Sequence, residues 1–184
     1  MTVLIFGSEG NIGRRLLRAF PSAIGVDKTP GADIVVDLAD CDYGSGALAQ
    51  ALKSARCVIH LATSADPAAP APVHLAAVTN TSRLVQACLD ARIPRLVLPS
   101  SDWAEPKDPA LMVNAYGQSK RAIEALAAMY CSHEGLEAVA LRIGWVPGSD
   151  EELAGAPDWL LANHWSDERL ISAFREAVGL TSPG

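Results

Sequence analysis

Residues 3–13 have the sequence VLIFGSEGNIG, in which a short apolar run leads directly into three spaced glycines. The run has the length of a strand that is buried on both faces. In a strand–loop–helix unit, Gly7 allows the tight turn, Gly10 lets the backbone approach a pyrophosphate, and Gly13 lets helix and strand pack closely. The stretch therefore predicts a dinucleotide-binding loop, although an ordinary strand-to-helix turn has similar glycines.

The rest of the chain continues the alternation of strand-length apolar runs with longer helical patterns. The apolar runs lie at 3–6, 24–26, 34–36, 57–61, 96–98 and 138–141. The helical patterns lie at 11–20, 44–54, 73–91, 115–134 and 166–178. This order predicts an α/β fold with a doubly wound, mostly parallel Rossmann sheet, strand order 3-2-1-4-5-6 and helices on both faces. We expect one domain, residues 1–184, with a short substrate-side extension from about residue 144.

Two stretches are predicted to be irregular and to leave the carboxyl ends of strands. Residues 66–72, DPAAPAP, form a proline-rich loop in which a helix cannot continue, and residues 144–158 follow the last strand. Ligands bind at this edge of an open α/β sheet, so both stretches are expected to border the site.

The composition limits the partners and the compartment. The chain has 184 residues, 49% of them apolar, and a net charge of -6 with its basic residues scattered singly, which argues against nucleic acid or an anionic membrane as a partner. No run approaches transmembrane length and no basic leader precedes the first strand, so a cytoplasmic protein is expected. The four cysteines lack CxxC pairing and are interpreted as reduced core residues. The four histidines lack metal-ligand spacing, and no metal is predicted.

Asp27 ends the second apolar run, about twenty residues after Gly7. A carboxylate at this place accepts hydrogen bonds from the ribose hydroxyls and repels a 2′-phosphate, so NAD is the predicted cofactor. Glu9 adds negative charge nearby, whereas Lys28 could serve NADP. The remaining alternative is that Asp27 forms the turn before KTPG.

Tyr116 and Lys120 lie four residues apart on a predicted helix and therefore share one face. A tyrosine with its ordinary pKa near 10 is a weak base, and a neighbouring ammonium together with a positive nicotinamide ring favours the phenolate. The pair predicts acid–base catalysis beside a nicotinamide, although an amphipathic helix with a half-buried tyrosine shows the same spacing.

These motifs occur in an order that resembles a known family. After the glycine loop and Asp27 come DLAD from residue 37, IHLAT from 59, NTSRLVQA from 80, LVLPSSD from 96, YGQSK from 116 and LRIGWVPG from 141. The chain resembles the extended short-chain dehydrogenases/reductases, also called the NAD-dependent epimerase/dehydratase family, over residues 2–148. Within that family it is most similar to uronate dehydrogenase-like members, with a shortened C-terminal region.

The resemblance implies a role for each matching residue. Ser101 holds the substrate oxygen, Tyr116 is the general acid/base, Lys120 lowers its pKa and binds the nicotinamide ribose, and Asn80 belongs to the proton relay; Ser101 could also be a strand-end cap. The cofactor-binding residues that the resemblance implies are Gly7, Gly10, Asn11, Ile12, Gly13, Asp27, Asp37, Leu38, Leu61, Ala62, Thr63, Tyr116, Lys120 and Ile143, with Asp37 and Leu38 at the adenine. The implied substrate-side residues are Ser64, Ser101, Asp102, Trp103 and Trp145.

The predicted function is that of an NAD-dependent oxidoreductase acting on a secondary alcohol or ketone of a sugar-like or small polar substrate. The alternatives are an epimerase or dehydratase that retains its NAD, and a non-catalytic NAD(H)-binding redox sensor. Only about forty residues follow Arg142, and residues 144–165 contain no arginine to hold a sugar carboxylate, so a uronic acid is not predicted. The tryptophans on the ligand side could form a sugar-stacking pocket or simply cover the sheet. A homodimer is expected because the family commonly pairs through the Tyr116 helix and the helix before it.

Overall fold

The computed structural model describes residues 2–105 and 112–179. A six-stranded sheet forms its centre, with the order β3-β2-β1-β4-β5-β6 that the sequence predicts. Every pairing between neighbouring strands is parallel, so the sheet is wholly rather than mostly parallel. The strands are Val3–Phe6 (β1), Ile24–Asp27 (β2), Ile34–Val35 (β3), Cys57–His60 (β4), Arg95–Ser100 (β5) and Glu137–Arg142 (β6).

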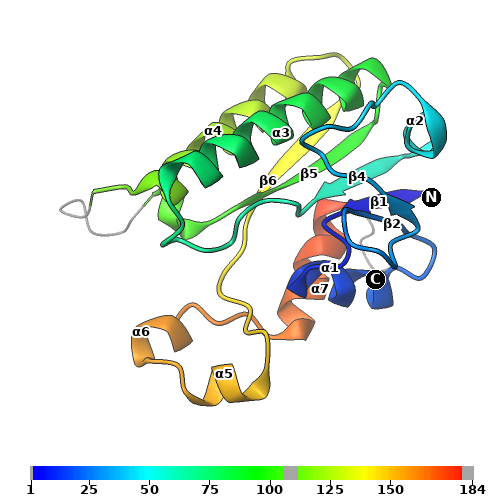
Figure 1. The fold of residues 1–184 in the computed structure, drawn as a ribbon. Helices are drawn as coiled ribbons and strands as arrows, with labels where there is room; N and C mark the ends of the chain where they lie inside the picture. The colour runs from blue at the N-terminus through cyan, green and yellow to red at the C-terminus, as the bar shows by residue number, and fades with distance from the viewer. Residues whose placement is uncertain (1, 106–111, 180–184) are drawn as a thin grey trace.

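Helices cover both faces of this sheet (Figure 1). Three of them, α2, α3 and α4, pack on one face, and α1 and α7 pack on the other. The helices are Asn11–Ala19 (α1), Gly46–Ser54 (α2), Ala71–Asp90 (α3), Ala115–Cys131 (α4), Asp150–Ala154 (α5), Asp158–Leu161 (α6) and Asp167–Ala177 (α7), and a single 3-10 turn lies at Asp102–Ala104 (η1). This is the doubly wound architecture that the alternating sequence pattern predicts.

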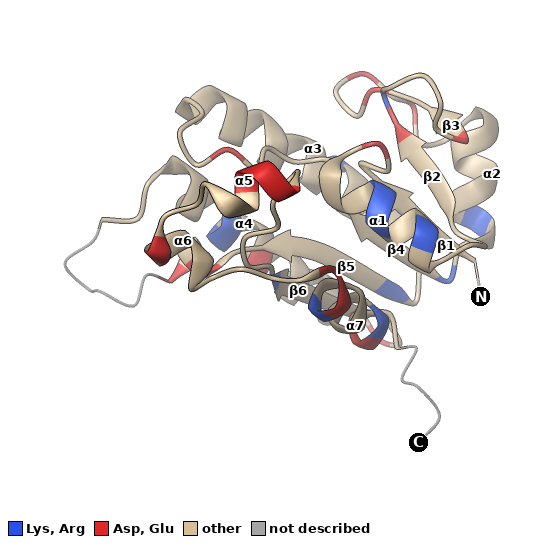
Figure 2. Ribbon diagram, turned by 90° about the horizontal axis from the view of Figure 1, so that it is seen from below, with Lys and Arg blue, Asp and Glu red and all other residues tan. Residues whose placement is uncertain are grey.

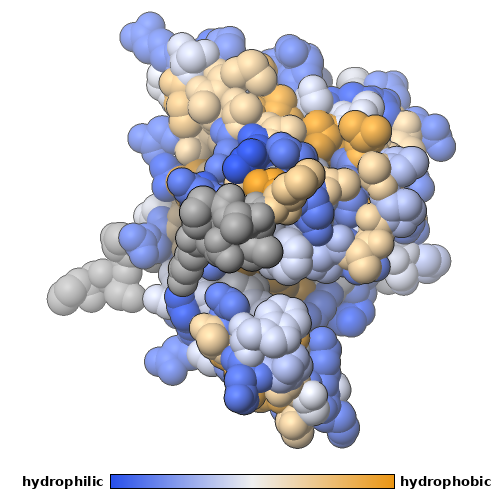
Figure 3. All heavy atoms as spheres, turned by 90° about the vertical axis from the view of Figure 1, so that its left-hand side faces the viewer, coloured by the Kyte–Doolittle hydropathy of each residue, from blue (hydrophilic) through white to orange (hydrophobic). Residues whose placement is uncertain are grey.

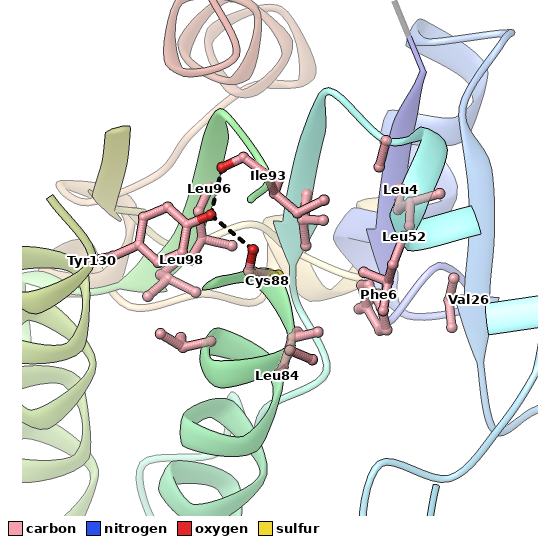
Figure 4. Packing of buried hydrophobic residues seen from close by; sticks show 14 of the residues in the cluster. Leu4, Phe6, Val26, Leu52, Leu84, Cys88, Ile93, Leu96, Leu98 and Tyr130 are labelled. Carbon is pink, nitrogen blue, oxygen red and sulfur yellow. Dashed lines mark hydrogen bonds between the residues drawn. The ribbon is translucent and has the colours of Figure 1, made fainter. Parts of the chain in front are cut away.

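The strands supply two cores because successive side chains point to opposite faces. In β1, Leu4 and Phe6 join the cluster beneath α2, α3 and α4, while Val3 and Ile5 join the cluster beneath α1 and α7. Figure 4 shows the first cluster, in which the hydroxyl of Tyr130 donates to the carbonyls of Ile93 and Cys88. Burial on both faces explains why the strands are apolar runs without polar alternation.

Several predicted features differ from the structure. Helix α3 begins at Ala71, inside the stretch 66–72 predicted to be irregular, because a proline is tolerated in the first turn of a helix. The helix predicted at 115–134 ends at Cys131, because the chain closes into turns that lead to Gly135 in the left-handed region (φ 74°). Cys57 and Cys88 are buried as predicted, but Cys131 is exposed at the end of α4 and Cys41 is only half-buried. An apolar neighbourhood in the sequence therefore misled the prediction for Cys131, at the end of α4, and for Cys41, in the chain between β3 and α2.

Residues 144–165, here called the C-terminal lobe, contain the two short helices α5 and α6, and α5 lies within the stretch 144–158 that the sequence predicted to be irregular. Ser149 caps α5 by accepting a hydrogen bond from the Glu152 amide at 3.2 Å, and the Glu152 carboxylate accepts from the Gly148 amide at 2.6 Å. A Ser-x-x-Glu pattern of this kind is a helix-start signal, so residues 149–152 contained the missing information.

The lobe projects from the body of the molecule (Figure 1), and α5 and α6 contain no buried residue. Figure 2 shows acidic residues on α5 and basic residues on α1. Figure 3 looks from the left-hand side of Figure 1, and there the surface of the lobe mixes hydrophilic and apolar residues. No helix within residues 2–105 and 112–179 is both long and apolar enough to cross a membrane.

Candidate active site

The glycine loop lies where β1 ends, against the end of β4. Gly7 has a φ of 82°, and a Cβ on it would lie 2.7 Å from the Ala62 nitrogen and from the Leu61 carbonyl carbon. A Cβ on Gly13 would lie 2.1 Å from the Gly7 oxygen. Both positions therefore require glycine, and Gly10 leaves the N-terminus of α1 without a side-chain cap. The backbone amides of the first helical turn remain available to an anion.

Asp27, at the end of β2, binds the glycine loop through a hydrogen bond. Its carboxylate accepts hydrogen bonds from the Glu9 amide and the Thr29 amide, each at 3.0 Å. Burial raises the pKa of Asp27, but the hydrogen bonds from Thr29 and Glu9 outweigh burial, and the net pKa lies below its ordinary value. Asp27 is thus an ionised carboxylate beside the glycine loop and also the former of the following turn, so the two interpretations of this residue are compatible.

The predicted adenine side lies beyond β3. Asp37 is exposed and accepts a hydrogen bond from the Ala39 amide at 3.0 Å, whereas Leu38 is buried. Arg83, on α3, donates to the carbonyl oxygens of Leu38 at 3.0 Å, Ala39 at 2.5 Å and Cys41 at 3.1 Å. This one side chain therefore fixes the turn at residues 38–41, a role that the sequence did not predict.

The structure brings the predicted catalytic residues together at the carboxyl ends of β4 and β5. Tyr116 and Lys120 lie on the first turns of α4 and are both buried, and the Lys120 Nζ lies 5.1 Å from the centroid of the Tyr116 ring. Ser101 directly follows β5, near enough to the Tyr116 hydroxyl to act on its pKa. The Ser101 hydroxyl also accepts from the Trp103 amide at 3.4 Å, so it begins η1 as well.

Lys120 is surrounded by residues from β4 and α3. Its Nζ donates to the Thr63 hydroxyl at 3.4 Å. His60, at the end of β4, is fully buried and shares a 2.9 Å hydrogen bond with the Thr81 hydroxyl, which itself donates to the Ala77 carbonyl. Because that hydroxyl proton is already used, we assign the donor role to the His60 Nε2.

Burial sets the charges of this cluster in the protein alone. Desolvation lowers the pKa of Lys120 to about 8 and that of His60 to about 3, where the charge on Lys120 also contributes. Desolvation raises the pKa of Tyr116, and the hydrogen bond from Ser101 only partly opposes that rise. The lowered pKa expected for Tyr116 from its lysine neighbour is therefore not present in the protein by itself.

Asn80 lies on α3 and is half-buried, but the Lys120 hydrogen bond in the described part of the chain goes to Thr63. The resemblance placed Asn80 in a proton relay, and that role stays a prediction. Ile12 and Ile143 are half-buried against the core beneath α1, and the Ile143 amide donates to the Ser100 carbonyl at 3.1 Å.

The substrate-side residues are less tightly held. Asp102 and Trp103 are exposed on η1, with the Trp103 ring 6.2 Å from that of Tyr116 in an edge contact. Ser64 is half-buried and accepts a hydrogen bond from the Asp66 amide at 3.4 Å. Trp145 is half-buried in the lobe and lies edge-on to His164 at 6.0 Å. Trp103 therefore borders Tyr116, while Trp145 helps to organise the lobe.

An ion-pair network surrounds the turn that carries Ser101. Glu124 of α4 accepts from the Ser100 hydroxyl at 2.5 Å and from two nitrogens of Arg142 at 2.8 and 3.1 Å. Arg142 also donates to the Glu105 carboxylate at 2.9 Å. The Arg142 hydrogen bonds hold the pKa of Glu124 below its ordinary value. The network joins β5, η1, α4 and β6, and no local sequence signal predicted it.

A second set of contacts links α1 to the lobe. The Asn11 amide donates to the Val146 carbonyl at 2.9 Å, and Arg15 donates to the Pro147 carbonyl and the Asp167 carboxylate, at 2.8 and 2.7 Å. The predicted role of Asn11 in cofactor binding stays a prediction, and in the structure its side chain links α1 to the chain after β6. Within the described residues, no cluster of His, Cys, Asp and Glu could hold a metal.

The glycine loop, the acidic residue at the end of β2 and the Ser–Tyr–Lys cluster define a Rossmann protein of the dinucleotide-dependent kind. The family model of the NAD dependent epimerase/dehydratase family matches residues 3–165. The chain belongs to this family, and its cofactor is NAD. The glycine positions that exclude a Cβ, the uncapped α1 and the ionised Asp27 fit this cofactor.

Comparison with individual proteins gives the same family. The chain is 32% identical to the L-arabinose 1-dehydrogenase (NAD(P)(+)) of Haloferax volcanii, with 81% of this chain and 68% of that protein covered. A short-chain dehydrogenase/reductase superfamily protein from Agrobacterium tumefaciens with bound NAD is 28% identical, with a TM-score of 0.63 over 80% of this chain and 50% of that one. MoeE5 in complex with UDP-glucose and NAD gives the same identity and TM-score over 80% and 55%. The chain thus spans about half the length of these solved structures.

Proposed function

We propose that this protein is an NAD-dependent oxidoreductase that interconverts a secondary alcohol and a ketone on a sugar-like or other small polar substrate. The observation that carries the proposal is the cluster of Ser101, Tyr116 and Lys120, buried together beside the glycine loop. A protein that only binds NAD has no need of a buried lysine and a buried tyrosine at this place. The relative that is an L-arabinose 1-dehydrogenase supports a sugar as the substrate class.

Each residue of the cluster has a task in this proposal. Ser101 donates a hydrogen bond that positions the substrate oxygen, and Tyr116 exchanges a proton with that oxygen as general base or acid. Lys120, with a pKa of about 8, is mostly charged at neutral pH and favours the phenolate of Tyr116. Bound NAD supplies the hydride acceptor and a positive ring. The Thr63 hydroxyl, just after β4, accepts a hydrogen bond from Lys120 and holds its ammonium from that side.

The proposal includes the organisation of the chain. Residues 1–184 form one NAD-binding domain, and the C-terminal lobe from about residue 144 is its substrate-side extension. The lobe follows β6, the last strand of the sheet, and the Asn11 contact holds its first residues at the N-terminus of α1. We further propose a homodimer that forms through α3 and α4, as the family resemblance implies.

The test is a substrate screen with the purified protein and NAD. Aldoses are the first members of the panel, followed by uronic acids, polyols and simple secondary alcohols, and the absorbance of NADH reports turnover. We expect at least one sugar to reduce NAD, and Tyr116→Phe to abolish that signal. Tight NAD binding with no turnover of any alcohol would instead favour the redox-sensor alternative. Conversion of a sugar into its epimer or dehydration product without net NADH would favour the epimerase or dehydratase alternative.

A further inference from the structure

His74 lies next to Tyr116 and has no part in the cofactor site described above. It belongs to the first turn of α3, directly after the proline-rich loop that leaves the carboxyl end of β4. Its ring lies edge-on to the Tyr116 ring, with 5.6 Å between the centroids and 68° between the planes. The side chain is only 2% exposed. Within the described residues, neither ring nitrogen has a hydrogen-bond partner.

This arrangement is costly unless something uses it. A neutral imidazole has one donor and one acceptor, and each buried polar atom without a partner costs roughly 1–3 kcal/mol. Buried polar groups in proteins are nearly always paired. His60, the other fully buried histidine, pairs its Nε2 with the Thr81 hydroxyl at 2.9 Å and leaves only its Nδ1 without a partner within the described residues, whereas His74 leaves both ring nitrogens unpaired. An apolar side chain at position 74 would keep the packing against Tyr116 and avoid the cost.

The position of His74 indicates which kind of group could pair with its ring nitrogens. Three side chains surround the Tyr116 ring: His74 from α3, Trp103 from η1 and Lys120 from α4 itself. Lys120 is paired with Thr63 at the end of β4, so its hydrogen bond is directed to the cofactor loop. His74 and Trp103 come from the two chain segments that follow β4 and β5, the segments that border a ligand in an open α/β sheet.

We propose that His74 is a substrate-binding residue, whose imidazole hydrogen-bonds to a hydroxyl of the substrate next to the one from which Tyr116 takes its proton. The inference rests on the proposed function and narrows it, because an imidazole that donates and accepts suits a vicinal diol. The substrate class is then a polyhydroxylated ring such as an aldose rather than a simple secondary alcohol. A site built to bind a hydroxyl discriminates strongly against an analogue without it, since its buried polar atoms are left unpaired.

The first experiment compares substitutions at position 74. His74→Phe keeps an aromatic ring against Tyr116 and removes both nitrogens, whereas His74→Asn restores a donor and an acceptor. For the sugar found in the screen, we expect His74→Phe to lower kcat/KM at least tenfold and His74→Asn to recover part of the loss. For its deoxy analogue that lacks the neighbouring hydroxyl, the wild type and His74→Phe are expected to agree within about threefold. An equal loss on both substrates would show a packing role and overturn the proposal, and so would no loss on either.

The second experiment reads the ring directly and needs neither turnover nor a variant. In protein labelled with ¹⁵N-histidine, the ring nitrogens of His74 are assigned by through-bond spectra and followed while NADH and the sugar are added. A shift of the His74 signals by the sugar, absent with the deoxy analogue, supports the site. Unchanged signals at saturating sugar overturn it. If the sugar shifted the His74 signals but the protein oxidised no alcohol, the proposed binding site would stand and the proposed function would be rejected. If the variant His74→Phe oxidised sugars as well as the wild type, the proposed function would stand and the proposed role of His74 would be rejected.

Discussion

The cofactor side of the molecule and the C-terminal lobe are held by different kinds of interaction. On the cofactor side, close backbone packing at Gly7 and Gly13 and buried side chains such as Lys120 leave little freedom. The lobe has no buried residue in α5 or α6, and backbone hydrogen bonds between Trp145 and Asn163 and between Trp165 and Trp145, each at 2.8 Å, join its two ends to each other. Hydrogen bonds from Asn11 and Arg15 of α1 bind its first residues to the body. Local opening is easiest where few apolar contacts are buried. On the proposed function, we therefore expect the reaction chemistry on the rigid side and the enclosure of substrate at the lobe.

The largest effect is expected from Tyr116→Phe. If the rigid side performs the chemistry, loss of the phenol hydroxyl should lower kcat at least about a hundredfold, the usual scale for a general acid/base. The affinity for NAD should stay within a few-fold of the wild-type value, because the glycine loop and Asp27 are unchanged. Steady-state kinetics and a direct NAD titration measure the two quantities. Tyr130→Phe is the matched control: its hydroxyl is buried in the core on carbonyls of Ile93 and Cys88, so it should cost stability and leave kcat unchanged. Full activity of Tyr116→Phe would refute the mechanism.

Lys120→Met measures how much the buried ammonium of Lys120 lowers the free energy of unfolding. Burial lowers the pKa of Lys120 from 10.5 to about 8, so the folded state disfavours the ammonium. Below about pH 8 the wild type carries this penalty in full. The penalty shrinks between pH 8 and 10.5, because the unfolded chain binds the extra proton there, and it vanishes above. We therefore expect Lys120→Met to raise the free energy of unfolding by roughly 2–3 kcal/mol at pH 7.

Urea unfolding of both proteins at several pH values between 7 and 10 measures that difference. The gain of Lys120→Met over the wild type should decrease steadily across this range, while activity stays lost throughout. A variant that is less stable than the wild type at pH 7 would show that the buried ammonium contributes favourable contacts that exceed its desolvation.

Asp27→Asn tests the charge at the ribose position. The wild type should bind NAD at least about tenfold more tightly than NADP, equivalent to about 1.4 kcal/mol. The Asp27 carboxylate accepts from the Glu9 amide through Oδ2 and from the Thr29 amide through Oδ1, so asparagine keeps an acceptor for only one of the two amides. Asparagine also forms this kind of turn, and the change therefore removes the charge together with one hydrogen bond of the loop. The ratio of the two affinities, measured by calorimetry, should decrease towards one. Equal affinities of the wild type for both nucleotides would contradict the assignment.

The residues that could be predicted from the sequence differ from those that could not in how far along the chain their contacts reach. Gly7, Gly13 and Asp27 act through the backbone next to them, and Tyr116 and Lys120 through one helix face, so their spacing along the chain was sufficient. The side chains that the sequence missed act across elements. Arg83 binds a turn more than forty residues away, and Glu124 joins Ser100 to Arg142. Such contacts follow only from how helices pack on the sheet.

In the lobe, a local sequence signal for a helix was present, but no buried apolar pattern supported it. The Ser149–Glu152 pattern starts a helix, but without buried residues nothing in the apolar periodicity pointed to α5. His74 was missed for a related reason, since a lone histidine at the start of a helix has no pattern of its own. Its proximity to Tyr116 depends on the packing of α3 against α4.

Glu124→Gln should have a smaller effect than the substitutions above. Glutamine keeps an oxygen for Ser100 but loses the charge that pairs with Arg142, so the turn that carries Ser101 becomes less well positioned. We expect kcat to decrease about three- to tenfold with NAD affinity unchanged, because small misplacements of a catalytic group are costly. Glu134→Gln, at an exposed position after the same helix, is the control and should behave as the wild type. A loss confined to thermal stability, with kcat per folded molecule intact, would show that the network does not position Ser101.

The smallest and most diagnostic effect concerns the lobe itself. Exposed tryptophans such as Trp159 (62% exposed) and Trp103 (44%) call for cover, by a second subunit or by closure on ligand. We expect either twice the 19.3 kDa monomer mass in light scattering, or amide exchange of residues 144–165 that slows a few-fold when NAD and substrate bind. Asn11→Ala removes the 2.9 Å contact between α1 and Val146 and should weaken the slowing caused by NAD alone. A monomer whose lobe exchanges equally fast with and without ligands would contradict both alternatives. It would also favour the redox-sensor alternative, because a site that stays open to water cannot shield the transferring hydride.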